Sequence, residues 1–301
     1  MSVIILPRKI LFVFNPIAGG KDKQYLVDII KKFGIKENIE CDFFATSGQD
    51  DTGKLEKYIN HVKYDAIVAI GGDGTVNLAG KVLVGTKIPL GIIPQGSANG
   101  LAKDLRIPED VNEALKLIGK FKAIPIDTLK INGKDSFHLS DFGYNARIIH
   151  RFAESIIRGK ISYLWYGLIE FFTFKPFSYT IKTPLLTYEG KAFMMIVTNT
   201  HQFGNDVVVN PLGKLDDGFF EIVIIKPFSR WVAAHVVHKL VSKTIHRSKY
   251  SKLIKCKEAI IYNTDNESFH IDGEPKNLGE KIDIQIVPKG LYIFRPMGEV
   301  E

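Results

Sequence analysis

Residues 71–75, Gly-Gly-Asp-Gly-Thr, combine a nearly bare backbone with one carboxylate and one hydroxyl. They join a predicted strand over 64–72 to a predicted helix over 75–85. Because glycine has no Cβ, another molecule can approach this backbone closely, and amides at a helix start suit phosphate oxygens. Asp73 could orient a magnesium–water cluster or accept a proton from an attacking hydroxyl, and Thr75 could cap the helix or bond a phosphate. The alternative interpretation is a tight turn with a capping threonine.

Three other strand ends carry small or hydrogen-bonding residues. They are Asn15 after the first predicted strand, Thr46 after the second, and Gly96, Ser97 and Asn99 after the fourth. Ligands of open parallel sheets bind beyond the carboxyl ends of the strands, so we expect these groups to gather at one edge. One such turn would be ordinary, whereas four together predict a phosphate site.

The first 125 residues alternate between strand and helix patterns, which predicts a doubly wound parallel sheet. The predicted strands are 9–16, 39–46, 64–72 and 88–94. The predicted helices are 22–34 (ended by Gly34), 51–62, 75–85, 98–105 and 110–120.

The pattern changes near residue 126 to mostly antiparallel strands with inserted helices. Extended segments flank a predicted hairpin turn at Asn132-Gly133. Helices are expected over 146–158, 160–174 and 229–245, and strands over 177–183, 185–199, 219–226, 257–263, 268–273 and 281–294. We therefore predict an α/β nucleotide domain over 1–126 and a β-rich substrate domain over 127–301, with residues 290–301 returning to the first and the active site in the cleft between the two.

Composition narrows the classes of function. The 301 residues carry a net charge of +7, which favours an anionic partner such as a nucleotide, a nucleic acid or a membrane surface. Cys41 and Cys256 have no metal or redox spacing, and no signal peptide or spanning helix is expected, so we predict a cytoplasmic protein. There is no G-x-x-x-x-G-K-[ST] sequence, and Asn77 replaces the last glycine of G-x-G-x-x-G, which disfavours a dehydrogenase.

Five motifs together resemble the diacylglycerol kinase catalytic-domain family, which includes bacterial lipid kinases and sphingosine kinases. In order they read NPIAGG, GGDGTVN, PQGSANGLA, LDDGFFEI and FHIDGEP, and they extend over nearly the whole chain. The GGDGT motif alone is shared with NAD kinases, whereas the full set is more specific. The resemblance implies an ATP- and Mg²⁺-dependent kinase that phosphorylates the hydroxyl of a membrane lipid such as diacylglycerol.

The resemblance also implies roles for individual residues. Nucleotide contacts fall on Thr46, on Ser97 and on Gly71, Gly72, Asp73, Gly74, Thr75, Val76 and Asn77. A structural Mg²⁺ would be bound by the Asp217 carboxylate and by the backbone carbonyls of Lys214 and Phe219. The proton acceptor of the family matches Glu274, and either Glu274 or Asp73 could be the general base.

The match departs from many bacterial diacylglycerol kinases at Gly100, where they carry an aspartate. Small residues at this position resemble the sphingosine-kinase branch, in which an acidic residue near the position of Asp141 faces the polar head of the substrate. A sphingoid base is therefore the alternative substrate, and a solvated strand-end carboxylate is the alternative interpretation of Asp141. The rival functions are a kinase for a soluble hydroxyl compound and a non-catalytic nucleotide- or lipid-binding regulator.

Two segments are candidates for contact with an anionic membrane surface. Residues 161–174 are apolar on nearly all sides, and we interpret them as a core helix or, alternatively, as a lipid-facing one. Residues 239–257 contain seven Lys or Arg and no acidic residue, which is typical of a solvated face or of a peripheral membrane contact. Nucleic-acid binding is disfavoured because the basic run has only Tyr250 for stacking. The sequence does not determine the oligomeric state, and a homodimer is one possibility.

Overall fold

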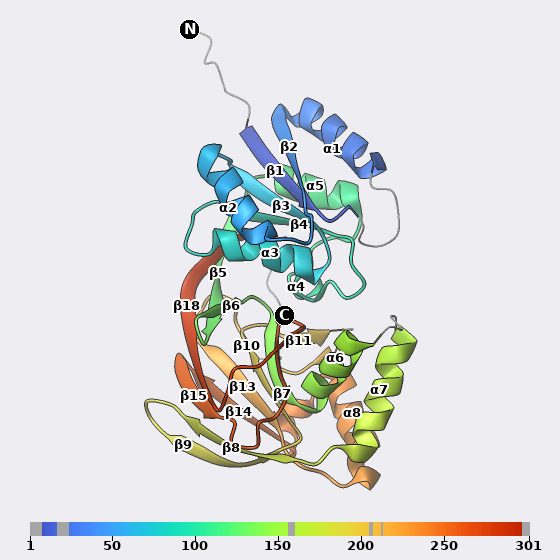
Figure 1. Ribbon diagram of the computed structural model, residues 1–301, viewed down its shortest axis with the longest axis vertical. Helices are drawn as coiled ribbons and strands as arrows, with labels where there is room; N and C mark the ends of the chain where they lie inside the picture. The colour runs from blue at the N-terminus through green and yellow to red at the C-terminus, as the bar shows by residue number, and fades with distance from the viewer. Residues whose placement is uncertain (1–7, 17–23, 156–159, 205–206, 212, 297–301) are drawn as a thin grey trace. The chain divides into compact units, whose positions relative to one another are not determined.

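The computed structural model describes residues 8–16, 24–155, 160–204, 207–211 and 213–296 (Figure 1). The chain divides into two compact units. Unit 1 contains residues 1–126 and 289–301, and unit 2 contains residues 127–288.

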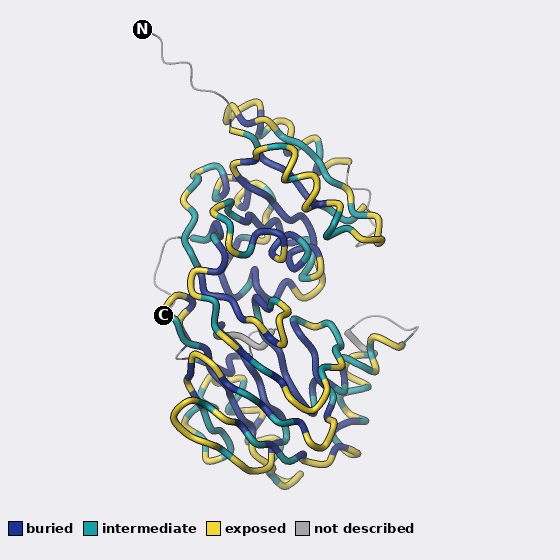
Figure 2. The backbone as a smooth tube through the Cα atoms, turned by 60° about the vertical axis from the view of Figure 1, so that its left-hand side comes forward, coloured by how far each residue is buried: buried dark blue, intermediate teal, exposed yellow. Residues whose placement is uncertain are grey.

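Unit 1 is built on a parallel sheet in the order β2-β1-β3-β4, followed by the end of β18. Its strands are β1 (Arg8–Phe14), β2 (Ile39–Ala45), β3 (Ala66–Gly71) and β4 (Leu90–Pro94). The last strand of the chain, β18 (Lys281–Phe294), pairs with β4 in parallel through Ile293 and Leu90. β3 and β4 are buried throughout, as expected for strands covered on both faces (Figure 2).

Helices cover both faces of the unit 1 sheet. They are α1 (Gln24–Glu37), α2 (Asp51–His61), α3 (Asp73–Leu83), α4 (Gly100–Asp104) and α5 (Val111–Gly119). Ile10 and Phe12 of β1 pack with Leu26 of α1 and Leu115 of α5. Successive strand residues point to opposite faces, which explains why the buried strands are apolar at every position.

Two expectations about helix ends were wrong. Gly34 does not end α1, which continues to Glu37. A Cβ at Gly34 would lie 2.7 Å from both Cys41 Sγ and Ile39 O, so this glycine permits close packing of α1 on β2. Similarly, α3 begins at Asp73 and not at Thr75, so Thr75 lies within the first turn and is not the cap.

Unit 2 consists of two mainly antiparallel sheets. One has six strands in the order β14-β13-β10-β7-β16-β17, and the other contains β18, β15, β8, β9, β5 and β6. Their bounds are β5 (Ala123–Ile131), β6 (Lys134–Ser136), β7 (Leu139–Gly143), β8 (Phe177–Lys182), β9 (Thr187–Ala192), β10 (Met194–Thr198), β13 (Phe220–Ile225), β14 (Ser251–Cys256), β15 (Glu258–Tyr262), β16 (Phe269–Ile271) and β17 (Glu274–Lys276). Phe142, Met195 and Phe220 from the first sheet share one core with Tyr179 and Ile261 from the second.

The remaining elements of unit 2 are mostly helical. They are α6 (Tyr144–Glu154), α7 (Lys160–Thr173), the 3-10 turns η1 (Arg230–Val232) and η2 (Ile245–Arg247), α8 (Ala233–Val241), and the short strand pair β11 (Gln202–Gly204) and β12 (Val207–Val208). Val236 and Ile245 pack on the six-stranded sheet against Ile196 and Val223.

Three differences from the sequence-based expectations concern unit 2. The strand expected over 185–199 divides at Phe193 into β9 and β10, which belong to different sheets. The helix expected over 229–245 ends at Val241. The basic run 239–257 is not one solvated face, because its second half forms β14, which pairs with β13.

The predicted fold class is confirmed for each unit: a parallel α/β unit, and a mainly antiparallel β unit with inserted helices. The Asn132-Gly133 turn joins β5 to β6 with positive φ at both residues, as predicted. None of the helices in the described part of the chain has the length and apolar character needed to cross a membrane.

Candidate functional site

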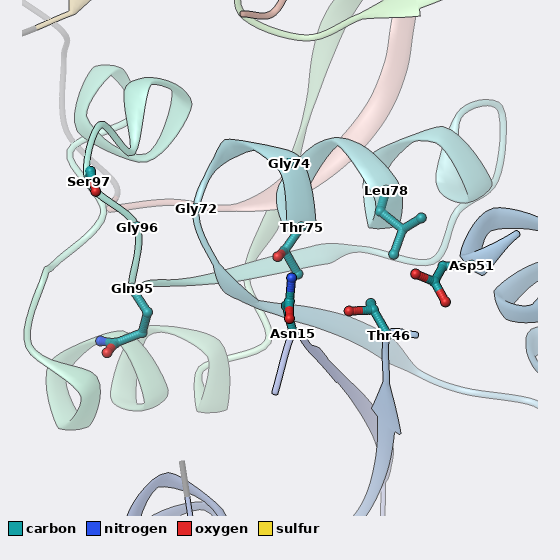
Figure 3. Close-up of a pocket in the computed structure, with 10 residues that line it drawn as sticks. All are labelled: Asn15, Thr46, Asp51, Gly72, Gly74, Thr75, Leu78, Gln95, Gly96 and Ser97. Carbon is teal, nitrogen blue, oxygen red and sulfur yellow. The ribbon is translucent and has the colours of Figure 1, made fainter. Parts of the chain in front are cut away.

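A pocket of about 400 Å³ lies in unit 1 at the carboxyl ends of the four parallel strands (Figure 3). The strand order reverses direction at β1, so this edge is the topological switch point where open α/β sheets bind ligands. The pocket is lined by Asn15, Thr46, Asp51, Gly72, Gly74, Thr75, Leu78, Gln95, Gly96 and Ser97. In Figure 3 the side chains of Asn15, Thr46 and Thr75 lie together, with Asp51 beyond Thr46.

Gly71, the last residue of β3, and Gly72, which follows it, are closely packed. A Cβ at Gly71 would lie 2.4 Å from Thr75 Oγ1, so a side chain there would displace the threonine. A Cβ at Gly72 would lie 3.1 Å from the Cα of Gly96, and one at Gly96 would lie 2.3 Å from the Cα of Gly72. The turns after β3 and β4 therefore touch backbone to backbone.

Gly74 differs from these glycines. It lies in the first turn of α3 and lines the pocket, and a Cβ there would meet no side chain or other segment of the described chain within 4 Å. The first amides of an α-helix lack partners within the helix and carry partial positive charge. The open side of Gly74 thus exposes a helix start that suits an anionic group.

Asn99 and Asp73 hold the two turns in place. Asn99 Oδ1 accepts a hydrogen bond from Gly96 N at 2.9 Å, and Asn99 Nδ2 donates to Gly96 O at 3.0 Å. Asp73 Oδ1 accepts from Gly100 N at 2.7 Å, which connects the first turn of α3 to the first turn of α4. Asp73 therefore has a structural task in addition to any chemical one.

Most of the predicted nucleotide residues meet at this pocket. The pocket is lined by seven of them: Asn15, Thr46, Gly72, Gly74, Thr75, Gly96 and Ser97. Gly71, Asp73, Val76, Asn77 and Asn99 are not among the lining residues, and the last three are buried behind them. Residues 17–20 of the predicted motif NPIAGG lie outside the described residues.

Sequence reasoning missed three lining residues: Asp51, Leu78 and Gln95. Asp51 accepts hydrogen bonds from Ser47 N at 2.8 Å and Gly48 N at 2.7 Å. Desolvation raises the pKa of Asp51, but these hydrogen bonds outweigh it and hold the pKa below its usual value. A carboxylate at the start of α2, four residues after Ser47, was the only signal available in the sequence.

None of the ten described residues that line the pocket carries a positive side chain. Backbone amides and hydroxyl groups can hold phosphate oxygens, but they do not cancel several negative charges. The described lining could thus hold phosphate oxygens, and the Asp51 carboxylate could bind a divalent cation that accompanies them.

Asp141 lies in unit 2 on β7 and is completely buried, so it is not a solvated strand-end carboxylate. Its Oδ2 accepts hydrogen bonds from His270 Nε2 at 2.8 Å and from Asn145 Nδ2 at 2.5 Å. Gly273 N donates to His270 Nδ1 at 3.1 Å, which leaves the ring proton on Nε2. Tyr163 donates to Asn145 Oδ1, and burial together with the charge of Asp141 raises the pKa of this phenol.

Glu274 begins β17, directly after the two-residue turn Asp272-Gly273 that follows β16. The φ values of 48° and 82° are those of a tight hairpin turn. The Asp272 carboxylate accepts hydrogen bonds from the backbone amides of residues 137–139 and from Ser136 Oγ, which fixes the turn against the β6–β7 connection. Glu274 itself is partly exposed and lies 2.9 Å from Lys276 Nζ.

Asp217, the carboxylate expected to bind a structural Mg²⁺, is already paired with an ammonium group in this arrangement. Asp217 Oδ2 lies 2.6 Å from Lys255 Nζ, and Asp217 Oδ1 accepts from Phe219 N at 3.1 Å. Lys255 Nζ also lies 3.3 Å from Glu221 Oε1, and these contacts with carboxylates, Asp217 first, raise the pKa of Lys255. The ammonium group already supplies the positive charge, and the assignment to Lys214, Asp217 and Phe219 stays a prediction that this geometry disfavours.

Two family profiles match different parts of the chain. The profile of the diacylglycerol kinase catalytic domain matches residues 9–131, and that of the YegS C-terminal NAD kinase beta sandwich-like domain matches residues 140–295. A protein from Yersinia enterocolitica named "Probable lipid kinase YegS-like" is 25% identical over 97% of this chain and 98% of its own. One from Klebsiella pneumoniae with the same name is 28% identical over 96% of each chain.

Solved structures resemble the whole chain. The crystal structure of a diacylglycerol kinase from Bacillus anthracis str. Sterne has a TM-score of 0.76 at 22% identity, covering 96% of this chain and 97% of that one. A second structure from that organism has a TM-score of 0.81 at 23% identity over 98% of both chains. At these identities the likeness establishes the fold of the chain.

Proposed function

Since the chain belongs to the diacylglycerol kinase family with a YegS-type C-terminal domain, and is a kinase, we propose that it transfers the γ-phosphate of MgATP to the hydroxyl of a membrane lipid. Diacylglycerol is the acceptor that we favour. The lipid acceptor comes from the names of the relatives, and ATP with its Mg²⁺ comes from the chemistry of the pocket.

The observation that carries the proposal is the pocket at the strand ends of unit 1. Its glycine and hydroxyl lining, together with the start of α3 at Gly74, suits the phosphates of a nucleotide. Its lack of positive side chains among the described lining residues favours a nucleotide that arrives with a bound cation.

In the proposed reaction, the oxygen of the lipid hydroxyl attacks the γ-phosphorus as the bond to the ADP oxygen breaks. The hydroxyl proton passes to Glu274, a partly exposed carboxylate held at a rigid turn. Asp73, whose Oδ1 accepts from Gly100 N, is the alternative base. A general base of this kind contributes roughly 10²–10⁴-fold in rate.

The burial of Asp141 bears on the alternative substrate. A sphingoid base would need an exposed carboxylate to meet its amino group, whereas Asp141 is 0% exposed and is held by His270 and Asn145. The burial of Asp141 and the contacts of its Oδ2 support diacylglycerol over a sphingoid base as the acceptor.

The test is an assay with labelled ATP and Mg²⁺ on mixed micelles that contain diacylglycerol, sphingosine or no lipid, with soluble NAD⁺ in parallel. We expect labelled phosphatidic acid as the main product and none when Mg²⁺ is replaced by EDTA. Main labelling of sphingosine or of NAD⁺ would overturn the proposed acceptor. Loss of label from every sample, with nucleotide binding intact, would support a regulator instead.

A further inference from the structure

The outer face of α7 carries large apolar side chains that project into solvent. Leu164 is 67% exposed, Trp165 62%, Leu168 50% and Phe172 59%. Leu164, Leu168 and Phe172 are spaced by four residues, so they form one stripe along the helix, with Trp165 beside it. The interpretation of residues 161–174 as a core helix was therefore wrong for this face. We call these four residues the α7 face.

The opposite side of α7 is fixed to α6 by polar contacts, so the orientation of the α7 face is determined. Tyr144 Oη donates to Gly167 O at 2.8 Å. Arg151 pairs with Glu170, which is 1% exposed and is the only acidic residue on the helix. A helix held in this way presents its apolar stripe to solvent.

Trp231 of η1 extends this surface. It is 97% exposed, and its neighbour Arg230 donates from Nη2 to Phe172 O at 2.7 Å, with its guanidinium 5.5 Å from the centre of the Phe172 ring. Figure 1 shows α7 beside the segment that leads into α8. Arg230 therefore connects the segment that carries Trp231 to the end of the α7 face, and exposed apolar side chains gathered in this way mark interaction sites.

Several basic side chains border this surface. Exposed Lys175 follows α7, Arg230 adjoins Trp231, and exposed Lys243 follows α8. From Lys226 to Lys257 the sequence has no acidic residue. Tryptophan favours the boundary between lipid headgroups and acyl chains, and basic residues are attracted to anionic headgroups.

We propose that the α7 face and Trp231 dock the protein onto a bilayer that contains anionic lipids. The inference rests on the proposed function in one respect, since a kinase for a membrane lipid needs such a contact. The partner is identified by complementarity: an apolar, tryptophan-bearing surface bordered by Lys175, Arg230 and Lys243 matches an anionic lipid interface.

The protein contains two tryptophans, Trp165 and Trp231, and both belong to the proposed surface. Tryptophan fluorescence therefore reports directly on this contact. The parent protein is mixed with phosphatidylcholine–phosphatidylglycerol vesicles whose acyl chains are brominated, without nucleotide or acceptor. We expect a blue shift and quenching in the parent and in the single variants Trp165→Phe and Trp231→Phe. If one of the single variants binds vesicles and its remaining tryptophan is not quenched, the proposal is wrong.

A matched pair of double variants locates the contact. Leu164→Gln with Leu168→Gln should lower vesicle partitioning about tenfold or more, because two large apolar side chains no longer leave water. Leu185→Gln with Leu186→Gln makes the same change at the exposed β8–β9 turn, where the leucines are 89% and 58% exposed, and should leave partitioning unchanged. Equal losses in the two would refute the assigned location.

Two further outcomes remain distinguishable. A blue shift that grows with protein concentration in the absence of vesicles would mean that a second copy covers the surface, and the membrane proposal would be wrong. If the parent protein phosphorylates no lipid but its tryptophans are still quenched by the vesicles, the docking surface is supported and only the proposed function is wrong.

Discussion

At the scale of single residues, Glu274 is the group whose chemistry matters most for the proposed reaction. Glu274→Gln keeps the size of the side chain and removes the proton acceptor. We expect kcat to fall by about 10²-fold or more with nucleotide affinity unchanged, as for a lost general base. Steady-state kinetics and calorimetry measure the two effects separately. Glu280→Gln, the same change at an exposed residue six positions further along the chain, is the control. Near-normal turnover in Glu274→Gln would mean that Asp73 is the base.

His270 connects the buried Asp141 to the turn that precedes Glu274. His270→Ala would remove the hydrogen bond to Asp141 Oδ2 and the acceptor for Gly273 N. A buried charged group that loses a hydrogen bond costs about 1.5–3 kcal/mol, so we expect the free energy of unfolding in urea to fall by about that amount. His270→Gln, which can still donate to Asp141, should recover part of the loss. Equal stability of parent and alanine variant would show that the Asp141–His270 contact is unimportant.

At the scale of elements, the first turn of α3 gives the sharpest test of the pocket. Gly72 is a poor site for this test because a side chain there meets the backbone of Gly96, whereas a side chain at Gly74 meets only the pocket. We expect Gly74→Leu to lower ATP affinity at least about tenfold while the melting temperature stays close to that of the parent, since the pocket is filled without a clash. Calorimetric titration with MgATP measures the change.

Asn112 provides the matched control for this variant. It is exposed and is the second residue of α5, the same helix position that Gly74 has in α3. Asn112→Leu should bind ATP normally. If Gly74→Leu also binds ATP normally, the nucleotide lies elsewhere.

The pairing of β13 with β14 raises a second question at this scale, because it brings Lys255 to Asp217 and Glu221. If the ammonium replaces a structural Mg²⁺, EDTA should leave the melting temperature of the parent unchanged, and Lys255→Met should lower it. The folded-state pKa of Lys255 is raised above 10.5, so its contribution is present below that pH and is lost as pH rises through the folded value. The stability gap between parent and variant, measured in urea, should therefore narrow only in strong alkali. If EDTA lowers the melting temperature of the parent, the assignment of a structural Mg²⁺ site is supported instead.

The elements also show what sequence could and could not predict. The strand ends of unit 1 were predictable because alternating strand and helix patterns place Thr46, Gly72 and Ser97 at one sheet edge. Asp51 and Gln95 were not predicted as lining residues, because their positions in the pocket depend on contacts between segments that are distant in the sequence. β14 was missed because its lysines hide the strand pattern, and the pairing of Lys255 with Asp217 has no local signal at all.

At the scale of the whole molecule, the unit boundaries make a prediction about the last residues of the chain. Leu291, Ile293 and Phe294 are at most 1% exposed and belong to unit 1, where the Phe294 ring packs against Phe121. A chain that stops after Pro288 loses all three. At about 2 kcal/mol for each buried side chain, the loss approaches the entire stability of a typical domain.

We therefore expect the shortened chain to lose ATP binding and the unfolding transition of unit 1, as measured by calorimetry. A chain that stops after Pro296 retains the three residues and should behave like the parent. Undiminished ATP binding after truncation at Pro288 would mean that the final strand is dispensable to unit 1.

The return of the chain to unit 1 also determines the order in which the protein can be completed on the ribosome. Unit 2 is continuous in sequence, whereas unit 1 waits for residues that follow all of unit 2. Between the end of β4 and the strand that pairs with it lie roughly 200 residues, which take roughly 10–40 s to synthesise. During that interval β4 presents an unpaired edge of the kind that recruits other chains. The amino-terminal unit of this kinase is thus begun first and finished last, and its newly made edge is where a chaperone would be needed.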